Sequence, residues 1–178
     1  KRVHLADAIV QFEGQIPPPD TPFQQVLQRL PGEPEVAIGM LSDEQLWGLH
    51  LFRTKARCMT CHEGALLSDN QFHNTGLSYY GRKFEDLGRY EVTGLASDVG
   101  RFRTPSLVAV SHTGPWMHNG LFSSLPGVVN LYNAGGARTK RREVYDNDPL
   151  YPETTPLLVK LELTKEERAA LVAFLTLL

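Results

Sequence analysis

The apolar residues of this chain recur with the spacing of short helices, and strand signals are weak throughout. In 3–14 they fall every three or four residues until Gly14 and the proline run 17–19, which predicts a helix with an abrupt end. A second helix is expected to follow Ser42 or Asp43, either of which can act as its N-cap. Its apolar face is formed by four side chains at helical spacing: Leu46, Leu49, Leu51 and Phe52.

Three further helices are expected. One covers 20–30 and has a proline near its start, another lies within 125–136 and is closed by glycines, and a third, amphipathic one covers 163–178. From 64 to 104, Gly, Asn, Ser and Asp take the place of periodic apolar residues, which predicts a long, mostly irregular segment. Segments of this length inside a compact domain usually wrap around something. The fold class expected from this pattern is mainly α.

Composition narrows the possible functions. The chain has 178 residues, of which 42% are hydrophobic and 21% charged, as in a globular domain. Its formal net charge of −2 argues against nucleic acid as a partner, because nucleic-acid-binding domains usually carry a strongly basic face. No apolar run approaches the roughly 20 residues of a transmembrane helix. The chain starts at Lys1 rather than Met, so we expect a processed chain or a fragment.

Both cysteines of the chain lie in one motif, Cys58-Met-Thr-Cys61-His62. At i, i+3 and i+4 the three side chains project from one face of a helical turn. Two thiols can then form thioethers to one haem while the imidazole reaches its iron, the c-type attachment motif C-x-x-C-H. A thioredoxin-like redox pair would need a βαβ context, and a zinc site would need a second Cys or His pair. Haem c attachment in bacteria takes place outside the cytoplasm, so we expect a periplasmic protein.

The sixth ligand of such an iron decides its chemistry, and the residues alone leave it open. Met59 lies inside the attachment loop and cannot reach the opposite face of the haem. Met117 could supply a thioether, which raises the reduction potential, or could simply pack beside an aromatic ring. The remaining candidates are a tyrosine and Met40, His50, His73, His112 and His118.

Several stretches together resemble the C-terminal haem domain of the bacterial di-haem cytochrome c peroxidase family, which includes MauG. They are CMTCHEGALLSDNQFHNTGL, DLGRYEVTG, DVGRFRTPSLVAVSHTGPWMHNGLFSSLPGVVNLYNAGG and DPLYPETTPLL. Members of this family carry two haem domains, and the resemblance implies that this chain is the second one. The first domain, where hydrogen peroxide binds, is then expected to be missing from the sequence, removed or carried on another chain.

The resemblance also implies the iron ligands. His62 would be the proximal ligand and the two cysteines the thioether anchors. The distal ligand falls twelve residues after Gly120, at a position that is Met in many peroxidases of the family and Tyr132 here, as in its MauG branch. A tyrosinate oxygen is a hard anionic donor that stabilises Fe(III), so a low-potential haem is expected. Met117 remains the alternative to Tyr132.

Other positions receive roles from the resemblance, each beside a simpler alternative. Thr113 and Pro115 match residues whose backbone carbonyls bind calcium between the two domains, or they merely shape a turn. The basic run 140–142 is a solvated loop or a docking patch. Four residues are expected near the haem propionates: His73, His118, Arg101 and Arg103. The alternative for the two histidines is that they hold loops in place, and the alternative for the two arginines is that they face solvent.

These expectations combine into one hypothesis. Residues 41–178 form a cytochrome c-like haem domain with long irregular loops around the haem, and 1–40 form an N-terminal helix and linker that pack on it. The function is that of a redox haem domain in a periplasmic peroxidase or MauG-like oxidase, acting with a second haem domain. Its electron donor would be a small cytochrome, a copper protein, a quinol or a protein side chain. The alternative is an autonomous mono-haem electron-transfer protein.

Overall fold

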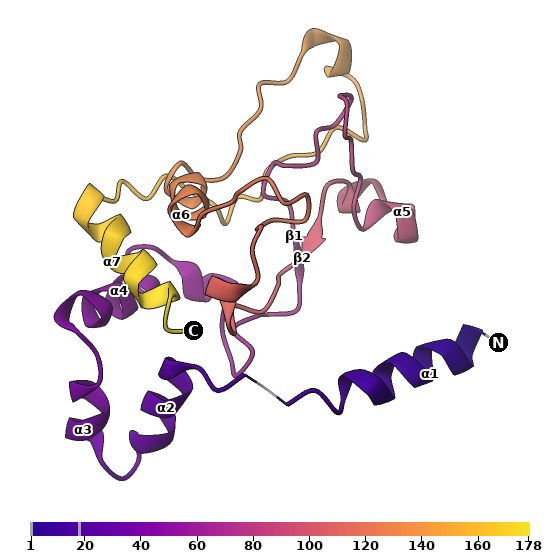
Figure 1. Ribbon diagram of the computed structural model, residues 1–178. Helices are drawn as coiled ribbons and strands as arrows, with labels where there is room; N and C mark the ends of the chain where they lie inside the picture. The colour runs from indigo at the N-terminus through magenta and orange to yellow at the C-terminus, as the bar shows by residue number, and fades with distance from the viewer. Residues whose placement is uncertain (1, 18) are drawn as a thin grey trace.

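The computed structural model describes residues 2–17 and 19–178, and its regular structure is mainly helical (Figure 1). One pair of very short antiparallel strands, β1 (Phe72–His73) and β2 (Phe102–Arg103), is the sheet of this part of the chain. The α-helices are α1 (Arg2–Glu13), α2 (Pro22–Arg29), α3 (Pro34–Gly39), α4 (Asp43–Arg53), α5 (Tyr90–Thr93), α6 (Leu125–Asn133) and α7 (Lys165–Leu175). The expected mainly α class is confirmed.

Short polar signals fix where three of the helices start. Each begins with a reciprocal capping box, in which the N-cap hydroxyl accepts from the third helical N–H and the side chain at that position accepts from the N-cap N–H. The pairs are Thr21 with Gln24 for α2, Ser42 with Gln45 for α4, and Thr164 with Glu167 for α7. The cap that the sequence predicts for the second helix is therefore present, with Ser42 rather than Asp43 as the cap.

The main core lies where α7 packs on α4, with α2 against the same cluster (Figure 1). Phe174 of α7 is 1% exposed and is the largest fully buried side chain among the described residues. The rings of Phe23 and Phe52 meet it edge to face, with centroids 5.2 and 5.3 Å away. This aromatic group joins α2, α4 and α7 into one unit that holds the start of the cysteine segment.

Long loops form most of the remaining chain. They extend away from the α4–α7 core in Figure 1 and include the whole of 64–104 except β1, β2, the single-turn α5 and a short 3₁₀ turn. In the strand pair, Phe72 faces Arg103 and His73 faces Phe102. The prediction that 64–104 is mostly irregular is thus correct.

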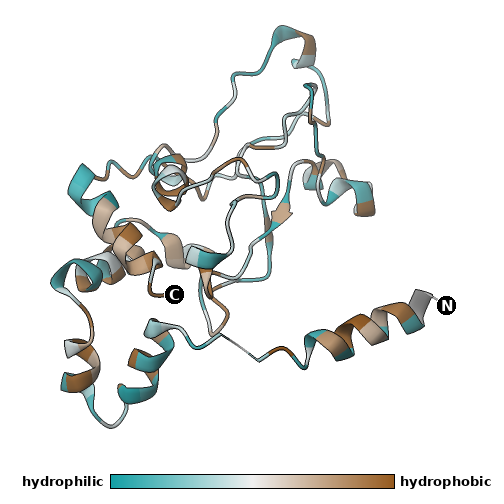
Figure 2. Cartoon of the chain, in the orientation of Figure 1, coloured by the Kyte–Doolittle hydropathy of each residue, from teal (hydrophilic) through white to brown (hydrophobic). Residues whose placement is uncertain are grey.

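The N-terminal region differs in part from what the sequence predicts. Helices α2 and α3 do contribute buried side chains to the core, Val26 and Ala37. Helix α1, in contrast, lies apart from the other helices (Figure 1), and all its side chains from residue 4 to 13 are exposed, including Val10 and Phe12 at 66% each. Figure 2 shows apolar and polar segments mixed along this helix. The expected packing of 1–40 on the haem domain therefore excludes α1 here.

None of the described helices is both long enough and apolar enough to cross a membrane.

Candidate haem site

The cysteine motif lies in a tight turn just after α4. The helix ends at Arg53, so it does not extend into the motif. Arg57 then adopts a left-handed conformation with φ of 56°, and Cys58–Thr60 form a single 3₁₀ turn. Because the N–H groups of Cys61 and His62 both donate to the Cys58 carbonyl, at 3.2 and 2.9 Å, the compact turn that the motif needs is present.

A backbone carbonyl orients the imidazole of His62. Nδ1 lies 3.0 Å from the carbonyl oxygen of Leu67, and a carbonyl can only accept, so this contact favours the tautomer with the proton on Nδ1. Nε2 then has its lone pair free, which is the usual arrangement of an iron-ligating histidine. Burial lowers the pKa of His62, against the opposing effect of the Leu67 hydrogen bond, and keeps the ring neutral. The residue is thus prepared as a metal ligand.

Cys58 and Cys61 are free and half-buried, so neither forms a disulfide. Burial raises the pKa of Cys58 to about 12. Burial, and next the charge of Asp69, also raise the pKa of Cys61. Both sulfurs are therefore protonated at neutral pH, which does not suit a redox-active thiolate pair.

Cys61 also belongs to a group of three possible metal-binding side chains. Its sulfur, a carboxylate oxygen of Asp69 and a ring nitrogen of His73 lie within 4.8 Å of one another. His73 Nε2 is already 2.8 Å from Asp69 Oδ2, so these two groups satisfy each other. Zinc would need the Cys61 thiolate, which its raised pKa disfavours and which a haem thioether would consume.

Tyr132 reaches the same region from α6. Burial raises the pKa of its phenol to about 12, and smaller contributions come from Cys58 and Cys61, so the ring lies within electrostatic reach of the cysteine turn. Met117 lies on a different segment, in a turn where it has φ of 68° and a half-buried side chain. The cysteines, His62 and Tyr132 together fit a c-type haem, because they offer two attachment sulfurs, a free imidazole nitrogen and an oxygen donor.

The two arginines predicted near the propionates have other partners. Arg101 lies 3.9 Å from the Asp98 carboxylate, and Arg103 donates to the side-chain carbonyl of Asn70. Asp98 also pairs with Arg89 at 3.2 Å while being only 7% exposed, so its charge is strongly compensated. Both predicted arginines are themselves exposed. Their contacts in this structure are with the loops and the β2 region.

The remaining predicted residues lie on the loops around the site. His118 stacks on Phe102 of β2, with ring centroids 3.5 Å apart and planes 7° from parallel. Desolvation lowers the pKa of His118, so this ring is neutral at pH 7. Thr113 and Pro115 lie in an exposed turn. The stacking agrees with the loop-holding alternative for His118.

Sequence reasoning missed the partner of His62. The partner is the main-chain oxygen of Leu67, a residue with left-handed φ of 50°. Every residue has a main-chain carbonyl, so a pattern of side chains does not indicate which one accepts this hydrogen bond. The backbone around it is fixed by a loop in which Ser68 N–H donates to the Glu63 carbonyl at 2.9 Å. The signal that could have found it is the motif itself, since an iron-ligating histidine needs an acceptor for its second ring nitrogen.

Comparison with known proteins places these features in a family. No protein-family model matches the chain. The cytochrome-c peroxidase IdrP1 of Denitromonas iodatirespirans is 36% identical over 75% of this chain, and the methylamine utilization protein MauG of Methylorubrum extorquens is 30% identical over 97% of it. The chain spans only 40% and 43% of those two proteins.

A solved structure agrees with the sequence relatives. The crystal structure of a MauG-like protein associated with microbial copper homeostasis matches 89% of this chain and 51% of its own, with a TM-score of 0.70 and 31% identity. The fold is thus that of a cytochrome c-like haem domain. The chain belongs to the bacterial di-haem cytochrome c peroxidase and MauG family.

Proposed function

We propose that the chain is the second haem domain of a periplasmic di-haem peroxidase or MauG-like oxidase, and that it supplies or stores oxidising equivalents for peroxide-dependent chemistry at another haem. One observation carries the proposal: the Cys58–Cys61–His62 turn, with Nδ1 of His62 held by a carbonyl, lies within electrostatic reach of the half-buried Tyr132. A bare attachment motif would fit any c-type cytochrome. The oxygen donor is what favours the MauG-like role.

In this proposal each residue has a defined task. Cys58 and Cys61 hold the haem covalently, and the carbonyl of Leu67 keeps Nε2 of His62 available. Haem c supplies a one-electron redox centre when it is bound. Tyr132 is protonated in the protein alone, with a pKa of about 12, and binding to a ferric ion would replace that proton. As an anionic hard donor, Tyr132 favours the higher oxidation states and thus a low reduction potential.

The whole enzyme is proposed to contain a further haem domain, at which peroxide reacts. The names of the relatives support peroxidase or MauG-like oxidoreductase activity, and their length leaves room for such a domain. The donor of electrons is proposed to be a small cytochrome, a copper protein, a quinol or an oxidisable protein side chain. No general acid or base for O–O cleavage is assigned to this chain.

Calcium is a further part of the proposal. Thr113 and Pro115 lie in an exposed turn, and their carbonyl oxygens are hard donors of the kind that calcium prefers. Two carbonyls provide less than half of the six to eight oxygens calcium requires, so the other ligands must come from elsewhere. Removing calcium with a chelator should change the spectrum of the complete protein, and adding calcium should restore it.

Redox titration of the haem-loaded protein tests the role of Tyr132. In Tyr132→Phe the reduction potential should rise and the low-spin spectrum should change, because the phenol oxygen is lost while ring volume is kept. Tyr90→Phe is the matched control, since Tyr90 lies at the start of α5, and it should leave both unchanged. Met117→Leu tests the alternative ligand.

The titration has clear contrary outcomes. A Tyr132→Phe variant with the wild-type spectrum and potential would exclude Tyr132 as a ligand, and a response confined to Met117→Leu would replace it by the thioether. Haem stain and mass of the natural polypeptide separate the two classes of function. A single haem on a protein of about this size, fully active in electron transfer, would favour the autonomous carrier.

A further inference from the structure

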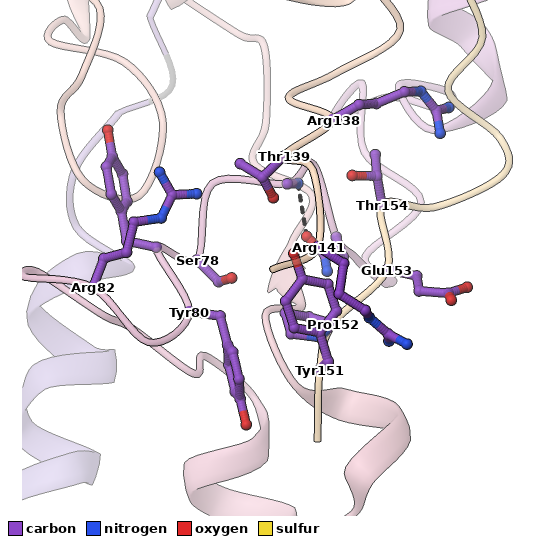
Figure 3. A pocket seen from close by; sticks show the side chains of 13 residues that line it. Ser78, Tyr80, Arg82, Arg138, Thr139, Arg141, Tyr151, Pro152, Glu153 and Thr154 are labelled. Carbon is purple, nitrogen blue, oxygen red and sulfur yellow. Dashed lines mark hydrogen bonds between the residues drawn. The ribbon is translucent and has the colours of Figure 1, made fainter. Parts of the chain in front are cut away.

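A second site lies away from the cysteine turn, between three loops. An open cavity of about 280 Å³ is lined by residues of 74–82, 138–141 and 151–154 (Figure 3). A neighbouring cavity of about 260 Å³ shares Arg82 and Thr139 with it. The two cavities are taken together as one hollow, because they share lining residues and lie on loops that the haem proposal does not use.

Cationic side chains dominate this hollow. The five that line it, contributed by two loops distant in sequence, are Arg82, Arg138, Lys140, Arg141 and Arg142. Glu153 is the one carboxylate among the lining residues, and in Figure 3 its side chain points away from Arg82. The whole chain has a net charge of −2, so this local excess of positive charge does not follow from composition.

The arginines of this hollow differ in whether their guanidinium groups already contact other groups of the protein. Arg138 donates to the carbonyl of Leu158, and the guanidinium of Arg141 lies 4.3 Å from the centre of the Tyr151 ring. Arg82 makes only a loose contact, 5.7 Å from the ring centre of Tyr79, and its guanidinium has no carboxylate partner among the described residues. Arg82 is therefore available to a ligand.

A buried hydroxyl points into the same space. Ser78 is 3% exposed and lines the cavity, and its hydroxyl has no hydrogen-bond partner among the described residues. No fully enclosed polar side-chain atom in this part of the chain lacks a partner, so the Ser78 oxygen keeps some contact with solvent. Figure 3 shows Ser78, Thr139 and Arg82 around the same space, with the guanidinium of Arg82 directed toward Thr139.

An amide adds a further donor. Asn74 is 4% exposed and lines the cavity, and its Oδ1 accepts from the Gly76 N–H at 2.7 Å. With the oxygen occupied, the amide NH₂ is the part of this side chain left for a ligand. The wall thus offers N–H and O–H donors and a free guanidinium. That set complements an acceptor with negative charge.

We propose that this cavity binds a small oxyanion, a carboxylate or a phosphate. The planar guanidinium of Arg82 suits the two oxygens of either group, and Ser78, Thr139 and Asn74 supply hydrogen bonds to the remaining lone pairs. The volume fits a small organic acid and excludes a folded partner.

Calorimetric titration of the haem-loaded protein at low ionic strength tests the proposal, with inorganic phosphate and citrate as separate probes. Saturable binding is expected for at least one of them, and the preferred probe identifies the ligand class. Arg82→Gln and Ser78→Ala should each weaken binding about tenfold, the loss of one charge-assisted hydrogen bond. Lys83→Gln is the matched control, because it removes the same charge one residue away, outside the cavity lining.

The Lys83→Gln control separates binding at this site from general attraction to positive charge. Lys83→Gln should change the dissociation constant less than twofold. If Arg82→Gln and Lys83→Gln weaken binding equally, the effect is general attraction to positive charge and the site does not exist. Absence of saturable binding of both probes overturns the proposal as well. Neither result bears on the haem, so the proposed function is tested independently.

Discussion

Replacing Gly48 by alanine probes the packing that positions the cysteine segment. Gly48 is a buried residue of α4, and an added Cβ would lie 2.0 Å from the carbonyl oxygen of Ala170 and 2.8 Å from Cβ of Phe174, both on α7. Ordinary contacts begin at 3.4 Å. Because the nearest obstacle is backbone, no side-chain rotation relieves it, and α7 must move away by roughly 1.4 Å, the difference between these distances.

The net cost is set by two opposing effects. Overpacking of a core typically costs 1–3 kcal/mol, and a clash with a helix backbone should lie near the upper end, about 3 kcal/mol. Alanine is intrinsically better in a helix than glycine by about 1 kcal/mol. Gly48→Ala should therefore lower the free energy of unfolding by about 2 kcal/mol, which for a chain of this length lowers Tm by about 4–8 °C.

Gly39→Ala is the control, since Gly39 also lies in a helix and its added Cβ would meet no atom within 4 Å. It should be neutral or stabilise by up to about 1 kcal/mol. Urea and thermal unfolding of both haem-loaded variants measure the difference. If Gly48→Ala is as stable as Gly39→Ala, the close approach of α4 and α7 is wrong. A loss that appears in both variants would point to backbone effects of glycine instead.

Three further predictions concern α7 and its contacts. Phe174→Ala removes the centre of the aromatic group and should cost about 3–5 kcal/mol in urea unfolding; an effect below about 1 kcal/mol would place this ring outside the core. Thr164→Ala should cost about 1 kcal/mol through loss of the cap, and Thr164→Ser should restore most of it. A hydrogen bond from Lys55 at 2.7 Å lowers the pKa of Glu167 below its usual 4.5. A lowered folded-state pKa gives stability that is present above pH 4.5 and is lost as pH falls through the folded value, so the urea midpoint of Lys55→Gln should fall less steeply on acidification than that of the natural protein; parallel curves would contradict the assignment.

Local signals explain which parts of the fold the sequence could predict. The helix starting after Thr164 is specified within one turn by a capping box, and the helix that ends before Gly135 is followed by glycines with φ near 80°. Such signals act between residues three or four apart, so no tertiary information is needed. The attachment motif is local in the same sense, which is why roles for Cys58 and His62 can be predicted from their spacing in the sequence.

The packing of α1 could not be predicted in the same way. The spacing of its apolar residues indicates a helix with one apolar face, but the spacing does not indicate which surface of the protein packs against that face. Here Val10 and Phe12 remain exposed, although the same kind of pattern in α2 buries Val26. The difference is tertiary: α2 lies where Phe23 can reach Phe174, and α1 lies apart from that core (Figure 1).

The contacts of the arginines could not be predicted from the sequence either. Arg101 and Arg103 lie near haem-domain motifs in the sequence, yet Arg101 lies beside Asp98 and Arg103 donates to Asn70, which is 33 residues away along the chain. Arg82 carries no motif, and only the folding of 138–141 over 74–82 brings it beside other cations and a buried hydroxyl. A charged side chain can bind a ligand only if the fold leaves it without a partner of opposite charge. Which side chains are left in this way depends on contacts between distant loops, and those contacts cannot be read from the pattern of a single sequence.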